Sequence, residues 1–116
     1  METNQNMVMI VSMVDKSVAD EVASQVYEIA QSKVSIFYGS GKTDERGFLG
    51  VRLNDEVVEI VCVVDHSMVD DITKLISEVG RMDELGKGYI VEIPSVTFIG
   101  PTPKADQAEA EPKADQ

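Results

Sequence analysis

Residues 11–20, VSMVDKSVAD, and residues 61–70, VCVVDHSMVD, are two versions of one pattern. They align at an offset of 50 residues, and each joins an apolar, β-branched run to an aspartate and a serine. Such runs are typical of buried strands, and Asp and Ser are favoured where helices begin. Each copy therefore predicts a strand that leads directly into a capped helix. Because capping preferences alone place Asp and Ser at such junctions, chance similarity between the two units stays open.

The chain on either side of these units supplies the remaining elements. The first strand is predicted over residues 7–14, and its helix has an apolar stripe at Val18, Val22, Val26 and Ile29. Further strands are predicted at 34–38, 57–64 and 89–93, a second helix ends near Gly80, and Pro94 sets off an extended piece at 95–99.

A β-α-β order that occurs twice is the ferredoxin-like motif. We therefore predict an α+β fold, a ferredoxin-like βαββαβ sandwich with a four-stranded antiparallel sheet and a short extra C-terminal strand. The domain is expected over residues 1–100. Residues 101–116 contain PKADQ twice and no large apolar side chain, which predicts a flexible acidic tail.

Composition excludes several classes of function. The net charge is −11, with 21 acidic and 10 basic residues, which argues against nucleic acid as a partner. No apolar run approaches the roughly 20 residues that span a bilayer, so no direct membrane insertion is expected. The single cysteine, Cys62, cannot form an internal disulfide, which suits the cytoplasm.

The predicted sheet has two unequal faces. Both helices would cover one face, and the other, rich in Val, Ile and Met, would remain exposed in a single chain. Exposed apolar faces of this kind usually have a partner, so we expect the chain to form an oligomer.

The stretch GSGKTD at 39–44 raises the question of a nucleotide hydrolase. A phosphate-binding P-loop has the pattern GxxxxGK[ST], which would require a glycine where this chain has Ile36. A long helix should also begin at the threonine, but DERGFLG follows, interrupted by two glycines. The P-loop interpretation fails on both counts.

Two other segments match a different family. KVSIFYGSGK (33–42) resembles the base of the T-loop in PII signalling proteins, and ELGKGYIVEI (84–93) resembles their B-loop and fourth strand. The resemblance extends over residues 7–99, with the T-loop at 39–56 and the B-loop at 81–88.

The resemblance implies a homotrimer that senses a small ligand in the clefts between its subunits, with ATP, ADP or AMP as the ligand and no cofactor needed for folding. It also implies regulation of a target, such as a membrane transporter or an enzyme, through T-loop residues Arg46, Phe48 and Arg52. The implied ligand residues are Gly39, Gly41, Lys42, Val63, Gly86, Lys87 and Gly88. Glycines let backbone N–H groups approach phosphate oxygens, and Lys42 would supply a cation. Alternatively, Gly39 and Gly41 are ordinary turn residues and Lys42 is solvated.

The chain departs from the PII pattern at three places. Tyr89 stands where the family has a lysine, the basic pair of the last strand is absent from FIGPT (98–102), and the T-loop is short and lacks a tyrosine. These departures favour a second hypothesis, a PII- or CutA-like trimeric adaptor that binds no nucleotide.

No catalytic or metal site is expected. His66 is the only histidine, and it lies at a helix start, where it is more often a surface residue than a ligand. Asp83 and Glu84, beside the B-loop, would oppose a phosphate. The sequence therefore predicts a regulatory protein and not an enzyme.

Overall fold

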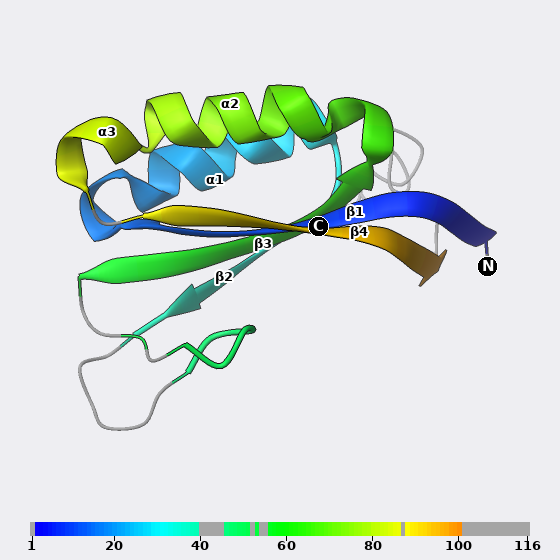
Figure 1. The fold of residues 1–116 in the computed structure, drawn as a ribbon, viewed down its shortest axis with the longest axis horizontal. Helices are drawn as coiled ribbons and strands as arrows, with labels where there is room; N and C mark the ends of the chain where they lie inside the picture. The colour runs from blue at the N-terminus through cyan, green and yellow to red at the C-terminus, as the bar shows by residue number, and fades with distance from the viewer. Residues whose placement is uncertain (1, 40–45, 52, 54–55, 87, 101–116) are drawn as a thin grey trace, which may run out of the picture.

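The computed structural model describes residues 2–39, 46–51, 53, 56–86 and 88–100, and it shows an antiparallel sheet with its helices on one face (Figure 1). The elements in chain order are β1 (Glu2–Asp15), α1 (Lys16–Ala30), β2 (Val34–Tyr38), β3 (Val57–Asp65), the 3-10 turn η1 (His66–Met68), α2 (Val69–Val79), α3 (Met82–Leu85) and β4 (Tyr89–Gly100). The strand order is β2-β3-β1-β4. Each neighbouring pair is antiparallel, which confirms the predicted α+β, ferredoxin-like fold class.

The core lies between the two long helices and the two central strands. Ile10 of β1 and Ile60 of β3 are fully buried there, because alternate residues of a strand point to the same face. Val22 of α1 and Ile72 of α2 meet them from the helical layer and are also fully buried. Each such side chain stabilises the fold by about 1.5–3 kcal/mol relative to an exposed one.

The repeated sequence pattern has the same geometry in both copies. Asp15 caps α1 by accepting hydrogen bonds from the Ser17 backbone N–H at 3.0 Å and from its hydroxyl at 2.5 Å. Asp65 accepts the equivalent bonds from Ser67 at 2.9 and 2.6 Å. The two bonds from Ser67 hold the pKa of the Asp65 carboxyl below its usual value, so the cap stays ionised.

The apolar stripe of α1 is only partly as predicted. Val22 and Val26 are buried, but the residues that complete the buried face are Ala19 and Ala23. Val18 is partly buried against the core, whereas Ile29, the last residue of the predicted stripe, is 40 % exposed. The two alanines continue the same helical spacing as the valines and let the helix approach the sheet, which turns Ile29 toward solvent.

The predicted extra C-terminal strand is instead the second half of β4. This strand runs from Tyr89 to Gly100 and pairs with β1 along its length, so Pro94 does not end it. The pairing shifts register on either side of Met7, and the strand continues past the irregularity. Proline is tolerated because β4 is an edge strand in the described sheet and needs no N–H bond there.

Two residues near this irregularity have left-handed backbones. Asn6 has a φ of 63° and Ser95 a φ of 61°, one on each strand of the β1–β4 pair. Beyond them the two strands continue as a ribbon, because β3 ends at Asp65, opposite Met7. Figure 1 shows this ribbon extending past the rest of the sheet.

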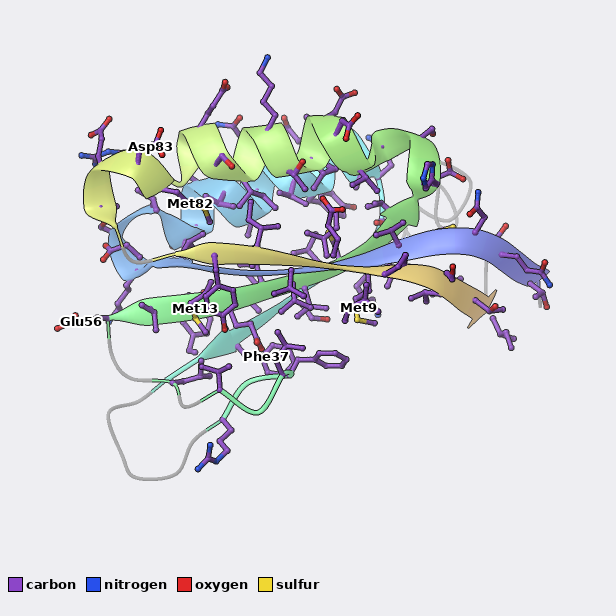
Figure 2. The ribbon with its side chains drawn as sticks, viewed as in Figure 1. Met9, Met13, Phe37, Glu56, Met82 and Asp83 are labelled. Carbon is purple, nitrogen blue, oxygen red and sulfur yellow. The ribbon has the colours of Figure 1, made fainter. Side chains whose placement is uncertain are left out.

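The sheet face opposite the helices is less open than the sequence suggested. The turn of residues 46–51 lies beneath it, on the side away from α1 and α2 (Figure 1). Val11 and Met13 of β1 and Val61 of β3 are buried, although they point away from the helices, and Leu53 is only 3 % exposed. Figure 2 shows Met13 on this side of the sheet. The expectation of an uncovered face is therefore wrong for its central part.

Two further expectations, the flexible tail and the lack of membrane insertion, concern residues that the structure describes only in part. The predicted tail, residues 101–116, lies outside them. Within them, no helix has the length and apolar character required to cross a membrane.

Replacing Asp15 by Ala should lower the free energy of unfolding by about 1 kcal/mol, because the Ser17 N–H loses its acceptor at the start of α1. Urea unfolding at a fixed protein concentration measures the change. Asp15→Asn keeps an acceptor and should lose clearly less, and Glu78→Ala on the exposed side of α2 should stay within about 0.5 kcal/mol of the parent chain. Equal losses in Asp15→Ala and Glu78→Ala would contradict the capping role.

Candidate ligand site

The first glycine segment follows the edge strand β2. Tyr38, the last residue of β2, pairs with Val58 of β3, so Gly39 lies at the end of the sheet. Gly41, Lys42 and Arg52 lie outside the described residues. Of the loop residues predicted to contact a partner, Arg46 and Phe48 are exposed, and the Arg46 guanidinium donates to the Gly50 carbonyl at 2.9 Å.

The second glycine segment surrounds a one-turn helix that the sequence did not predict. α3 ends at Leu85 and is capped by Gly86, whose N–H donates to the Met82 carbonyl at 3.1 Å and whose φ of 64° suits glycine. Gly88 passes close to β1, where an added Cβ would lie 2.6 Å from the Met13 carbonyl oxygen. The backbone geometry therefore explains why residues 86 and 88 are glycines without any ligand. Lys87 lies outside the described residues.

The two segments share one end of the sheet but lie on opposite edges. Tyr38 on β2 is level with Val58 on β3 and Val14 on β1, and Tyr89 on β4 pairs with the adjacent Met13. Strand spacings of about 4.8 Å place the β2 and β4 edges about 14 Å apart. One chain therefore does not bring Gly39 and Gly88 together around a single phosphate.

Val63 lies away from both glycine segments. It pairs with Met9, five residues along β3 from Val58, which is about 17 Å toward the other end of the sheet. Within one chain, Val63 joins neither Gly39 nor Gly88 at a common site.

The charges around α3 are mostly negative. Asp83 and Glu84 occupy its first turn, and the nearby Arg81 guanidinium is bonded to the Glu84 carboxylate at 3.0 Å. A cation that is paired in this way offers less to a phosphate than a free one. The described residues around α3 therefore present more negative than positive charge, which does not favour an anion.

Sequence reasoning missed one unusual residue, Glu59. It is fully buried on β3, on the sheet face opposite the helices, and one of its oxygens accepts a hydrogen bond from the Phe48 N–H. Its Oε2 and the buried hydroxyl of Tyr89 have no hydrogen-bond partner among the described residues. Burial raises the pKa of Tyr89, and the negative charge of Glu59 raises it further. A single charge inside the apolar run VVEIVCVV was the available sequence signal.

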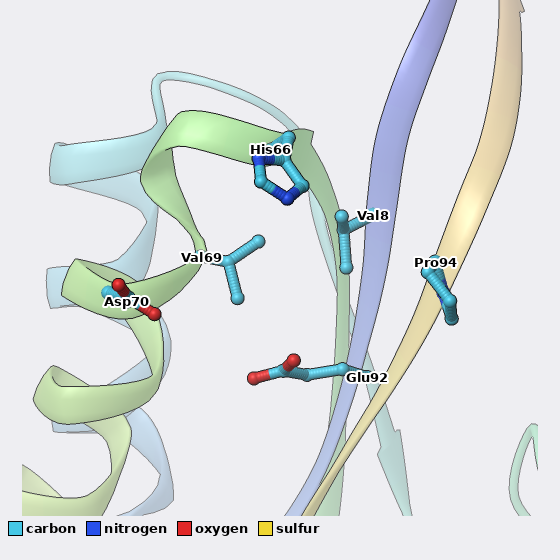
Figure 3. A pocket seen from close by; sticks show the side chains of 6 residues that line it. All are labelled: Val8, His66, Val69, Asp70, Glu92 and Pro94. Carbon is cyan, nitrogen blue, oxygen red and sulfur yellow. The ribbon is translucent and has the colours of Figure 1, made fainter.

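A separate pocket of about 270 Å³ lies between the helical layer and the β1–β4 pair. Its lining is Val8, His66, Val69, Asp70, Glu92 and Pro94 (Figure 3). Val8 pairs with Val64, so the pocket lies at the end of the sheet opposite Gly39. Two carboxylates make it a poor site for a phosphate. No group of three His, Cys, Asp or Glu side chains suited to a metal occurs among the described residues.

Several solved structures have a fold similar to that of this chain. CPII of Thiomonas intermedia K12, bound to ADP, AMP and acetate, is 11 % identical with a TM-score of 0.58, covering 87 % of this chain and 95 % of that one. Arabidopsis thaliana PII, bound to citrate, is 23 % identical with a TM-score of 0.56, covering 78 % of each chain. A Thermus thermophilus protein described as PII-like is 11 % identical with a TM-score of 0.54, covering 85 % of this chain and 94 % of that one.

No protein-family model and no curated protein sequence matches the chain. The likeness is therefore one of structure, and it agrees with the resemblance seen in the two glycine segments.

The buried thiol of Cys62 should be inert in the folded chain, because burial raises its pKa to about 11 and the reactive thiolate is scarce at pH 8. Alkylation by iodoacetamide, followed by mass spectrometry, should be at least roughly 100-fold slower than in urea. A Ser77→Cys variant carries an exposed thiol on α2 as the matched control and should gain one rapidly alkylated site. Rapid modification of native Cys62 would contradict the buried position.

The chain adopts the fold of the PII and PII-like signalling proteins.

Proposed function

We propose that the chain is a divergent PII-like regulatory protein that works in the cytoplasm as a homotrimer. It binds an adenine nucleotide, ATP, ADP or AMP, in the clefts between neighbouring copies. Residues 39–56 act as the T-loop that contacts a target such as a membrane transporter or an enzyme. No catalytic step is part of this function.

The observation that carries the proposal is the position of the two glycine segments. They lie at the same end of the sheet but on opposite edges, so the β2 edge of one copy and the β4 edge of another can form one cleft. The proposed ligand residues are Gly39, Gly41 and Lys42 after β2, Gly86, Lys87 and Gly88 before β4, and Val63 of a neighbouring β3. CPII, a structural neighbour, is described as bound to ADP and AMP, which supports this class of ligand.

The exposed turn supports the role of the loop. Phe48 is 49 % exposed, and Leu49 and Val51 beside it are exposed as well, so the turn presents a cluster of apolar side chains of the kind that marks contact surfaces. Together with Arg46 and Arg52 it would give the loop an apolar centre with basic flanks. Such a surface suits an acidic, partly apolar target site.

A second candidate is a trimeric adaptor that binds no nucleotide. The pairing of Arg81 with Glu84 favours this alternative, as does Tyr89 in place of a basic residue. The structural reasons for Gly86 and Gly88 favour it as well, because they explain the glycine pattern without a ligand.

Isothermal titration with ATP, ADP and AMP separates the two candidates. The regulatory protein should bind at least one of them with one site per chain. Lys42→Ala should weaken that binding tenfold or more, about 1.4 kcal/mol, because a phosphate loses its cation. Lys74→Ala, on the exposed side of α2, is the control and should bind like the parent chain. Absence of heat with all three nucleotides, with an unchanged melting temperature, would leave only the adaptor.

Sedimentation equilibrium tests the assembly separately from the ligand. We expect a particle of about 38 kDa, three copies of the 12.7 kDa chain. If the measured mass remains that of a single chain up to high micromolar concentration, both the intersubunit cleft and the trimeric adaptor are ruled out.

A further inference from the structure

The turn of residues 46–51 is a compact unit with its own hydrogen bonds. The Gly47 N–H donates to the Val51 carbonyl at 3.0 Å, and the Gly50 N–H donates to the Gly47 carbonyl at 3.0 Å. The Arg46 guanidinium closes the turn on the Gly50 carbonyl. Gly50 has a φ of 80°, a left-handed conformation that favours glycine. The turn can therefore move as one body.

Glu59 attaches this turn to the sheet. Its carboxylate is fully buried and accepts the Phe48 N–H, and Gly47 passes directly over it. A Cβ on residue 47 would overlap the Glu59 carboxylate unless that side chain moved, so glycine suits this close approach.

The docked turn leaves some buried polar atoms of the sheet face without a hydrogen-bond partner among the described residues. Phe37, Glu59, Met13 and Tyr89 form one row across the four strands. In this row the Glu59 Oε2 and the Tyr89 hydroxyl have no hydrogen-bond partner among the described residues, and buried groups in that state are destabilising.

The docked turn also leaves several of its own apolar side chains exposed to water. Phe48, Leu49 and Val51 remain more than a third exposed while the turn is docked. The docked turn thus covers apolar surface on the sheet and leaves other apolar surface in water. A partner that covered the whole face would bury more apolar surface than the turn does.

We propose that the turn of residues 46–51 is a plug, which occupies this sheet face in the single chain and leaves it when a second copy of the chain packs there. The inference rests on the proposed function in requiring that the chain assembles. It adds that the T-loop and the assembly compete for one surface, through Glu59.

A second copy is the occupant that the face fits. Val11, Met13 and Val61 give it an apolar centre, as in surfaces between identical subunits. The two glycine segments lie on opposite edges of the sheet, so the proposed ligand cleft is incomplete in one chain. Displacement of the turn would also expose the rest of Phe48, which is already 49 % exposed while docked, so assembly would increase the exposure of the T-loop.

A reversible crosslink tests the competition. The double variant Gly47→Cys and Glu59→Cys puts one cysteine on each side of the contact between the turn and β3, and thiol titration first establishes that the pair oxidises to a disulfide. The oxidised variant should remain a single chain at concentrations where the same protein, once reduced, assembles. We expect the apparent dissociation constant of assembly to fall at least tenfold on reduction, as measured by sedimentation with and without dithiothreitol. The parent chain under both conditions is the control for Cys62.

The outcomes separate the two proposals. If the oxidised and reduced variants assemble equally, the plug is wrong and the trimer stands. If neither they nor the parent chain assembles at any concentration, the plug and the proposed trimer both fail.

Amide hydrogen exchange on the parent chain gives a test that needs no variant. The Phe48 N–H should be protected in dilute solution, where it donates to Glu59, and should exchange at least tenfold faster once the chain has assembled. Val61, in the centre of β3, should stay protected in both states as an internal reference. Persistent protection of Phe48 in the assembled protein would overturn the plug.

Discussion

The pairing of β1 with β3 is the constraint on which the rest of the structure depends. The two strands run antiparallel from Met7 opposite Asp65 to Asp15 opposite Val57. Because each strand ends in a capping aspartate, the helices begin at opposite ends of the sheet and return across the same face. This arrangement buries the even-numbered residues of both strands against the helices and leaves β2 and β4 as edges. The two glycine segments owe their common end of the sheet to this register.

Much of this architecture could be predicted from local patterns. The bounds of β2 agree with its apolar run, and both caps agree with the repeated aspartate and serine. Such features depend on residues close in sequence, where spacing and capping chemistry decide the outcome. The fold class followed from the order of these elements.

The errors arose where distant parts of the chain decide the structure. Ile29 has helical spacing but lies outside the contact surface that Ala19 and Ala23 define with the sheet. Pro94 marks a break by local rules, yet pairing with β1 carries the strand through it. The charge of Glu59 favours a surface position, but the turn of residues 46–51 packs against it in the folded chain. For the candidate site, the two glycine segments could be found in the sequence. Their positions on opposite edges of the sheet could not, because these positions depend on strand order.

The paired irregularity at Asn6 and Ser95 bears on how the chain avoids unwanted association. β4 is a long, largely apolar edge strand, and an edge of that kind can recruit strands from other molecules and begin fibrous aggregates. Pro94 and the left-handed Ser95 interrupt its regular row of donors and acceptors near the middle, opposite the irregularity at Asn6 on β1. An incoming strand would find only short stretches that match. The irregularity thereby disfavours strand-by-strand growth along this edge, which has no natural end.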